Sequence, residues 1–207
     1  MNPTPVIIVL AAGLGRRFDD ARHKLAQPLG TSTVLGQTVG HAIESGLPVV
    51  VVTTEPLLAE VATLVAGRDV VLMPTLQRAG GVGVGMGHSI AAGVAARPNA
   101  DGWLVLPGDM PLVRASTLRA VAAAMPQQPV VYAQHMGRRG HPVGFSAELF
   151  SDLVQLSGDD GARRIVARYP SMGVDVDDPG VLMDVDTTAD LAALRANLAG
   201  AHPTGLR

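Results

Sequence analysis

A chain of 207 residues, 47% of them hydrophobic, is long enough for one large α/β domain with its own core. It contains no cysteine, which excludes thiol nucleophiles, disulfide scaffolds and thiolate zinc sites. The net charge is −2 and aromatic residues make up 3%, so the sequence has neither the positive field nor the stacking rings of a nucleic-acid-binding protein.

Short β-branched runs alternate with longer stretches rich in alanine and leucine. Because the short runs are apolar at successive positions, they predict buried strands at 6–10, 49–53, 70–73, 103–106 and 129–132. Helices are predicted at 33–44, 57–65, 88–96 and 116–124. This alternation predicts a parallel sheet covered by helices on both faces, with ligands at the edge where the strands end.

The last third of the chain is less regular. A further strand is predicted at 139–145, and helices at 147–156, 161–168 and 187–198. We expect a single domain over 1–199 and a frayed tail over 200–207. The apolar run 6–10 is too short to span a bilayer and has no basic residue before it, so we expect a cytoplasmic protein without a membrane partner.

The first predicted strand leads into a loop of small and basic residues. Small side chains let the backbone approach a ligand closely and present N–H groups to phosphate oxygens. The planar guanidinium of Arg16 and the compact ammonium of Lys24 would neutralise the charge of a triphosphate. The residues predicted to bind a nucleotide here are Leu10, Ala11, Ala12, Gly13, Gly15, Arg16 and Lys24.

Two well-known phosphate loops do not describe this segment. The pattern G-x-x-x-x-G-K-[ST] does not occur in the sequence, and the dinucleotide fingerprint G-x-G-x-x-G fails at its third glycine, where Phe18 stands. The alternative is an ordinary Gly-rich turn with solvated basic residues.

A second glycine-rich segment, 80–87, precedes the helix predicted at 88–96. Its glycines would form a strap able to wrap a nucleotide, and we assign Gly85 and Gly87 to nucleotide binding. Ser89 could donate a hydrogen bond to a base or phosphate near the helix start. Glycines ahead of a helix can equally do no more than end a loop, and His88 fits a surface position.

A carboxylate follows the strand predicted at 103–106. Gly108 and Asp109 would lie at the ligand edge, and Pro111 prevents the strand from continuing. A hard oxygen ligand here suits Mg²⁺, which takes one or two carboxylates plus substrate phosphates. A Gly-Asp-x-Pro turn without a ligand is the alternative.

A second candidate carboxylate, Asp186, lies just before the last predicted helix. Thr187 and Asp190 form a helix-start pattern, which places Asp186 outside the helix, where it could face the metal. We assign Asp184 and Asp190 to turn and capping duties.

The first predicted strand is followed by the pattern Leu-Ala-Ala-Gly-x-Gly-x-Arg and, further on, by a lysine. This order resembles the signature of the MobA-like NTP transferases, and within them that of the molybdenum cofactor cytidylyltransferases. The resemblance runs from Val6 to Leu194, and Asp19 stands where family members often have glycine. It implies a Rossmann-like, three-layer α/β/α fold with a mostly parallel sheet, similar to the nucleotide-diphospho-sugar transferases. It also implies that the protein binds an NTP with Mg²⁺ and attaches the nucleotide to the terminal phosphate of molybdopterin.

The resemblance also assigns roles to individual residues. Gly-Asp-Met-Pro is similar to the family's metal motif, which implies that Asp109 binds the metal, and Asp-x-Asp-Thr-x-x-Asp implies that Asp186 completes the site. The Arg-Gly-His-Pro segment implies an acceptor pocket, and a basic hairpin tip is the alternative. The acceptor-binding residues are then Arg139, His141 and Pro142.

The segment 157–164 is also similar to a family segment. Ser157 with Asp160 is another capping pattern, so whether Arg163 contacts the acceptor stays open.

The implied reaction is an in-line attack by an acceptor phosphate oxygen on the α-phosphorus of the NTP. This nucleophile is already an anion at neutral pH, because the second pKa of a phosphate monoester is about 6. Catalysis then rests on positioning and charge neutralisation, with Arg16, Lys24 and Asp109 as the catalytic residues. Leu-Ala-Ala-Gly resembles the cytidylyl branch, whereas guanylyl members tend to read Leu-Ala-Gly-Gly, so Ala12 favours CTP over GTP.

Two alternatives remain from the sequence alone. A nucleotidyltransferase for another phosphate, such as a sugar 1-phosphate, would have the same first loop and the same Asp109. A non-catalytic nucleotide-binding factor for molybdoenzyme maturation would need no full metal site, so Lys24, Asp109 and Asp186 argue against it. A molybdoenzyme or its chaperone is the protein partner that the cytidylyltransferase interpretation suggests.

Overall fold

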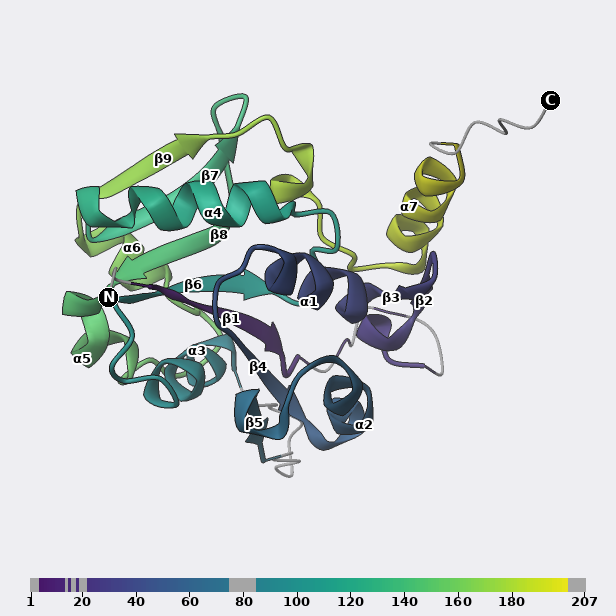
Figure 1. Cartoon of the computed structure of the whole chain (residues 1–207), viewed down its shortest axis with the longest axis horizontal. Coiled ribbons are helices and arrows are strands. Elements are labelled where there is room, and N and C mark those ends of the chain that lie inside the picture. The colour runs from purple at the N-terminus through teal and green to yellow at the C-terminus, as the bar shows by residue number, and fades with distance from the viewer. Residues whose placement is uncertain (1–3, 14, 16–17, 19–21, 75–84, 201–207) are drawn as a thin grey trace.

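The computed structural model of the chain describes residues 4–13, 15, 18, 22–74 and 85–200. Seven strands form one sheet in the order β5-β4-β1-β6-β8-β7-β9 (Figure 1). Within this sheet β8 is antiparallel to both of its neighbours, and the other pairings are parallel. The strands are β1 (Val6–Ala11), β4 (Val49–Thr54), β5 (Val70–Met73), β6 (Gly102–Pro107), β7 (Val130–His135), β8 (Arg138–Ser146) and β9 (Ser171–Asp175).

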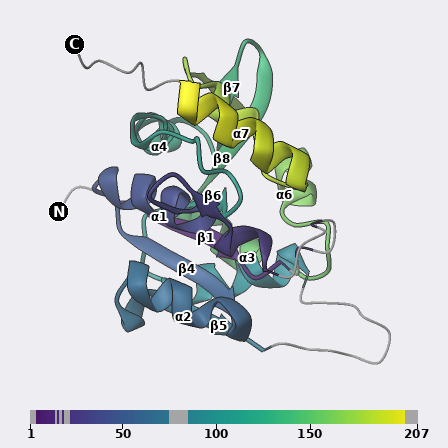
Figure 2. The same cartoon turned by 90° about the vertical axis from the view of Figure 1, so that its right-hand side faces the viewer.

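Helices cover both faces of the sheet, as Figures 1 and 2 show from two directions. One face carries α1 (Val34–Glu44), α2 (Glu55–Leu64) and α4 (Ala115–Ala124), and the other carries α3 (Met86–Ala95), α5 (Phe150–Leu153) and α6 (Arg163–Arg168). This arrangement confirms the predicted three-layer α/β/α fold with a mostly parallel sheet.

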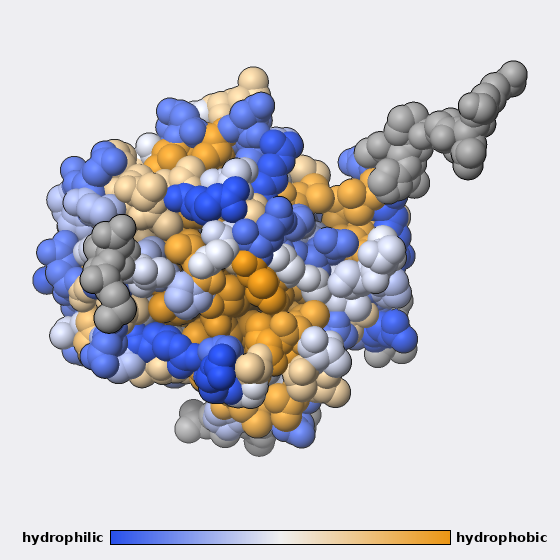
Figure 3. All heavy atoms as spheres, viewed as in Figure 1, coloured by the Kyte–Doolittle hydropathy of each residue, from blue (hydrophilic) through white to orange (hydrophobic). Residues whose placement is uncertain are grey.

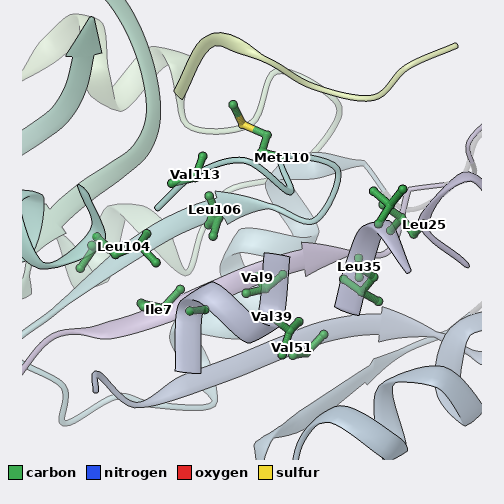
Figure 4. Packing of buried hydrophobic residues seen from close by; sticks show 14 of the residues in the cluster. Ile7, Val9, Leu25, Leu35, Val39, Val51, Leu104, Leu106, Met110 and Val113 are labelled. Atoms are coloured by element: carbon green, nitrogen blue, oxygen red, sulfur yellow. The ribbon is translucent and has the colours of Figure 1, made fainter. Parts of the chain in front are cut away.

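The core consists of two hydrophobic clusters, one on each side of the sheet, because successive residues of a strand point to opposite faces. Ile7 of β1 belongs to the cluster under α1, and its neighbour Ile8 belongs to the cluster under α3; both are fully buried. Figure 4 shows side chains of the first cluster, with Val39 of α1 packed beside Val9. Both faces of β1 are therefore apolar, and this explains its unbroken hydrophobic run.

Short elements connect these layers. A 3-10 turn η1 (Lys24–Ala26) leads into a small hairpin, β2 (Pro28–Leu29) with β3 (Ser32–Thr33). The last helix, α7 (Thr188–Gly200), lies off the main sheet beside this hairpin, where Nη2 of Arg195 donates to the carbonyl of Pro28 at 2.7 Å (Figures 1 and 2). The other 3-10 turns are η2 (Gly67–Asp69), η3 (Met125–Gln127), η4 (Ala147–Leu149) and η5 (Pro179–Leu182).

The strand predicted at 70–73 has the predicted bounds, and the other predicted strands differ from the observed ones by one to three residues at an end. One predicted helix is corrected, and one strand of the main sheet was missed. The helix predicted at 147–156 is a 3-10 turn, η4, followed by the four residues of α5. The edge strand β9 was not predicted, because its five residues are only partly buried and include a glycine. The predicted tail begins at residue 200, which ends α7, and 201–207 lie outside the described residues.

The surface seen in Figure 3 combines polar rims with an apolar area over the middle of the molecule, around the position of α1 in Figure 1. Ile43 of α1 is half exposed. In the part of the chain that the structure describes, no helix has both the length and the apolar character to cross a bilayer.

The strand order creates a crevice between β1 and β6. The chain leaves β1 toward β4 on one side and later returns to β6 on the other side of β1. In an open parallel sheet the loops diverge at such a switch point, and ligands bind outside the carboxyl ends of the two strands. Because β8 is antiparallel to β6, its first residues lie at this same edge.

Candidate functional site

A cavity of about 810 Å³ lies at the switch point, lined from the ends of β1 and β6, the start of β8 and the segment before α7. Such a volume is typical of small-molecule sites. Of the predicted site residues, the cavity lining contains Leu10, Ala12, Gly13, Gly15, Lys24, Ser89, Asp109, Arg139, His141 and Asp186. Among described residues the lining leaves out Ala11, Gly85, Gly87, Gly108 and Pro142, and Arg16 lies outside the described residues.

Two carboxylates in the lining of this cavity converge on one ammonium group. Nζ of Lys24 donates to Oδ2 of Asp109 at 2.6 Å and to Oδ1 of Asp186 at 2.9 Å. The three side chains are only 12%, 19% and 21% exposed. Burial by itself lowers the pKa of Lys24, but the charges and hydrogen bonds of the two aspartates outweigh it, so the net pKa lies above its ordinary value and the ammonium stays charged.

Backbone hydrogen bonds fix Asp109 at the end of β6. The N–H of Gly108 donates to the carbonyl of Leu10 at 2.9 Å, and Oγ1 of Thr38 donates to the carbonyl of Gly108 at 2.9 Å. A Cβ at Gly108 would lie 2.9 Å from the Leu10 carbonyl oxygen, so only glycine allows this approach of β6 to β1. Gly108 therefore supports the neighbouring Asp109 by close packing.

The segment before α7 is tied to the same point. The N–H of Val185 donates to the carbonyl of Asp109 at 2.9 Å, which brings Asp186 beside it. Thr187 and Asp190 bond reciprocally: the Thr187 N–H donates to Oδ2 of Asp190 at 2.7 Å, and the Asp190 N–H donates to Oγ1 of Thr187 at 3.1 Å. This is the capping pattern expected at the start of α7, and it leaves Asp186 outside the helix.

The loop after β1 presents its backbone to the cavity. A Cβ built at Gly13 would meet nothing within 4 Å, so a side chain at this position would project into open space. Gly15 has a φ of +60°, a conformation that favours glycine. Nε2 of His23 donates to the carbonyl of Gly13 at 2.9 Å; burial, the main cause, lowers the pKa of His23 despite this bond. His23 thus orients the loop, a role that the sequence did not indicate.

The start of β8 forms the opposite wall. The guanidinium carbon of Arg139 lies 4.1 Å from the ring centroid of Tyr132, so the side chain is held by a cation–π contact. Burial lowers the pKa of Arg139 and that of His141. Nδ1 of His141 is buried and makes no hydrogen bond with the described residues. Pro142, the third predicted acceptor residue, is buried within β8.

The second glycine segment is described from Gly85 onward, and its two described glycines have packing roles. A Cβ at Gly87 would lie 2.7 Å from the carbonyl oxygen of Ser157, and one at Gly85 would collide with Gly158. The N–H of Gly87 donates to the carbonyl of Gly158 at 2.9 Å. Ser89, one turn into α3, is 4% exposed and lines the cavity.

Asp184 is a cavity residue that the sequence analysis assigned to a turn. It lines the cavity, and its pKa is raised, first by burial and then by the charges of Asp186 and Asp109. Asp184 and Asp186 are two residues apart and both line the cavity, and this spacing was the available signal. Other lining residues outside the predicted set are Leu25, Met86, Pro107, Met110, Arg138, Gly140, Asp159, Val181 and Leu182, and Arg163, whose role the sequence left open, also lines the cavity.

Residues 7–172 match the sequence model of the MobA-like NTP transferase domain. The chain belongs to this family. It is therefore a nucleotidyltransferase, and its cavity at the switch point is the candidate site for an NTP and a small-molecule acceptor.

Relatives extend over almost the full length of the chain. The purine catabolism protein PucB of Bacillus subtilis strain 168 is 29% identical over 206 residues, which cover 94% of this chain and 97% of PucB. The crystal structure of Rv0371c from Mycobacterium tuberculosis H37Rv is 30% identical, with a TM-score of 0.79 over 95% of this chain and 100% of that chain. A structure of Rv0371c in complex with manganese is 28% identical, with a TM-score of 0.75 over 93% and 98% of the two chains.

The donor set fits a hard divalent cation that binds together with phosphates. Among the described residues no group of three or more histidine or acidic side chains forms a ready-made metal site. One oxygen of Asp109 and one oxygen of Asp186 nevertheless converge on the Lys24 ammonium. Mg²⁺ typically takes one or two carboxylates and completes its shell with water and substrate phosphates, so two aspartates suffice for it in a nucleotide-binding protein.

Proposed function

We propose that the protein transfers CMP from CTP to the terminal phosphate of molybdopterin or its molybdenum cofactor, releasing pyrophosphate, with Mg²⁺ held by Asp109 and Asp186. The convergence of these two carboxylates on one cation, at 2.6 and 2.9 Å, is the observation that carries the proposal. It creates a cation-binding point between a backbone loop suited to phosphate and a cationic wall suited to an anionic acceptor.

Each wall of the cavity has its own task in this proposal. The loop at Gly13 and Gly15, with Arg16 and Lys24, would bind the triphosphate, because it offers N–H groups and positive charge without side-chain obstruction. Arg139 would hold the acceptor phosphate as a charge-assisted partner, and His141 would contact the phosphate or the pterin. The Lys24 and Arg16 charges would stabilise the departing pyrophosphate.

The reaction needs no proton acceptor in the protein. An oxygen of the acceptor phosphate, already ionised at neutral pH, forms a bond to the α-phosphorus of CTP, and the bond from that phosphorus to the bridging oxygen of the β-phosphate breaks. The electron pair of the broken bond leaves with pyrophosphate. A bound Mg²⁺ supplies charge neutralisation between the two anions. The residues of the chain contribute by holding both phosphates in line.

The choice of CTP rests on Ala12. It is 4% exposed and lines the cavity, so its methyl group narrows the space next to the first loop. A smaller pyrimidine tolerates this loss of space better than a purine does. One relative is named a purine catabolism protein, and we propose that the recipient molybdoenzyme, or its chaperone, acts in that part of metabolism.

Incubation of the pure protein with each NTP, Mg²⁺ and molybdopterin tests the proposal by pyrophosphate release. We expect release with CTP and, after treatment with EDTA, none until Mg²⁺ or Mn²⁺ is restored. Release with GTP alone would overturn the nucleotide assignment. Release with a sugar 1-phosphate but not with molybdopterin would overturn the acceptor assignment, and full turnover by Asp109→Ala would overturn the enzyme mechanism itself.

A further inference from the structure

We infer that Lys24 is an internal counter-ion that occupies the metal position in the nucleotide-free protein, so that the divalent cation enters only when nucleotide phosphates draw the lysine away. The inference rests on the proposed function, because it takes Asp109 and Asp186 as the metal ligands. It adds an order of events: the metal and the nucleotide bind together, and the metal alone binds weakly.

The contacts of Lys24 are those of a cation held in place of a metal. Its ammonium reaches one oxygen of each aspartate, at 2.6 and 2.9 Å, and only 12% of the side chain is exposed. A Mg²⁺ ion bound to the same oxygens would lie about 2.0–2.1 Å from them. The ammonium and the metal would then occupy one volume with like charges, so they exclude each other.

The type of residue at this position is also distinctive. Lys24 is the only lysine in the sequence, and every other residue among the 16 basic ones is an arginine. An ammonium on a four-carbon stem is a compact point charge that can rotate between partners, whereas a guanidinium is a planar fork fitted to bidentate contacts. A lysine therefore suits a site where one small cation must give way to another.

The stem of Lys24 runs beside the loop that would receive the phosphates. A Cβ at Gly15 would lie 3.5 Å from Cγ of Lys24, and the preceding residue, His23, bonds the carbonyl of Gly13. Because the stem already lies beside Gly15, rotation of its outer methylene groups would move the ammonium away from the aspartates and toward a triphosphate over this loop. The exchange preserves charge pairing, since the phosphates take the lysine and the carboxylates take the metal.

Binding linkage makes this exchange measurable. If Lys24 competes with the metal, its removal should increase the affinity of the nucleotide-free protein for a divalent cation. Energetic coupling between two binding events in one protein typically changes an affinity by about 5–150-fold, and we take this range as the scale for the exchange. We therefore expect Lys24→Met, and Lys24→Gln as a second variant, to bind one Mn²⁺ at least about tenfold more tightly than wild type without nucleotide.

Full-length proteins are titrated with Mn²⁺ at one pH, and the free ion is followed by electron paramagnetic resonance. Arg97→Met is the matched control, because it removes the cation of another part-buried pair, Arg97 with Asp69 at 2.7 Å, away from the cavity. Its Mn²⁺ affinity should equal that of wild type. Equal affinities for wild type and both Lys24 variants would overturn the inference.

Because the sequence contains one lysine, magnetic resonance of its side chain tests the inference on the wild-type protein. This test does not depend on whether a variant folds. Protein labelled with ¹³C,¹⁵N-lysine has one side-chain ammonium signal, that of Lys24. CTP with Mg²⁺ should move this signal strongly, whereas Mg²⁺ alone at the same concentration should leave it unchanged. A full shift with Mg²⁺ alone, or no shift with both ligands, contradicts the inference.

The two proposals can fail separately. If Asp109→Asn and Asp186→Asn abolish Mn²⁺ binding in the presence of CTP but the Lys24 variants bind no more tightly, the metal site stands and the counter-ion role is wrong. If the two aspartate variants still bind Mn²⁺ and CTP like wild type, the metal site of the proposed function is itself wrong.

Discussion

The two halves of the sheet hold their functional groups by different means. In the parallel half, β5-β4-β1-β6, backbone hydrogen bonds from Gly108 to Leu10 and from Val185 to Asp109 fix the position of a carboxylate. In the half formed by β8, β7 and β9, Arg139 is held by the ring of Tyr132, and Nδ1 of His141 lacks a partner among the described residues. The carboxylates proposed to bind the metal are thus positioned by backbone hydrogen bonds, whereas the groups proposed to bind the acceptor are held by side-chain packing.

The largest expected effect is on the carboxylates of the parallel half. Asp109→Asn and Asp186→Asn each keep the size of the side chain and remove its charge, so each should reduce kcat by at least about 100-fold, more than the loss of a residue that only orients a metal ligand. The assay is pyrophosphate release with CTP, Mg²⁺ and acceptor. Asp175→Asn on β9, outside the cavity lining, is the matched control and should retain full activity.

Substitution of a cation in the half formed by β8, β7 and β9 should raise the KM for the acceptor. Arg139→Gln removes a cation at the cavity wall, and loss of a charge-assisted hydrogen bond of about 1.5–3 kcal/mol should raise the KM for the acceptor about 10–150-fold. The KM for CTP should stay within twofold or so of wild type, because Arg139 lies on the wall opposite the β1 loop. A rise in the KM for CTP instead would reverse the assignment of the two walls.

Arg168→Gln is the matched control for this experiment. Arg168 also lies over an aromatic ring, that of Tyr169 at 5.4 Å, and it is outside the cavity lining. Its substitution should change neither KM.

The same contrast explains what the sequence could predict. The central strands β1, β4 and β6 were predictable because both of their faces are buried, which gives unbroken apolar runs such as that of β1. The edge strand β9 is partly exposed on both faces and carries no such run. The fold class therefore followed from the central strands, while the outer edge of the sheet needed the three-dimensional structure.

Contacts between distant segments were the least predictable part of the candidate site. Lys24 is 85 residues from Asp109 and 162 from Asp186, so no local pattern indicates that one ammonium joins them. The sequence instead assigned Lys24 to phosphates. Gly87 likewise lies against Ser157, which is distant in the sequence. The sequence cannot distinguish a glycine required for close backbone packing from a glycine in a ligand-binding loop.

Two glycines distinguish these roles experimentally. Gly87→Ala places a Cβ 2.7 Å from the Ser157 carbonyl oxygen, and such overpacking should lower the free energy of unfolding by about 1–3 kcal/mol, partly offset by the better helix propensity of alanine. Gly13→Ala adds a methyl group in open space, so stability should change by less than about 0.5 kcal/mol while the KM for CTP rises. Urea denaturation and steady-state kinetics measure both; an unstable Gly13→Ala with normal KM would remove Gly13 from the nucleotide site.

The smallest expected effect is on the pH dependence of the free energy of unfolding, to which one histidine from each half of the site contributes. Burial lowers the pKa of His23, beside the β1 loop, and of His141, in β8, below the ordinary value of 6.5. As the pH falls below 6.5 the unfolded chain takes up protons at these positions before the folded protein does, so the free energy of unfolding decreases. Well above pH 6.5 both states are neutral and this contribution vanishes.

His23→Gln and His141→Gln should each reduce the loss of stability between pH 7.5 and pH 5.5, measured by urea denaturation without metal or nucleotide. Because the two histidines belong to separate parts of the site, the double variant should show the sum of the two reductions. If His141→Gln leaves the pH dependence of stability unchanged, the His141 side chain must reach solvent when it is protonated while the protein stays folded. The side chains of the acceptor half would then be adaptable rather than fixed, and the contrast between backbone-held and packing-held groups would be larger than the static contacts indicate.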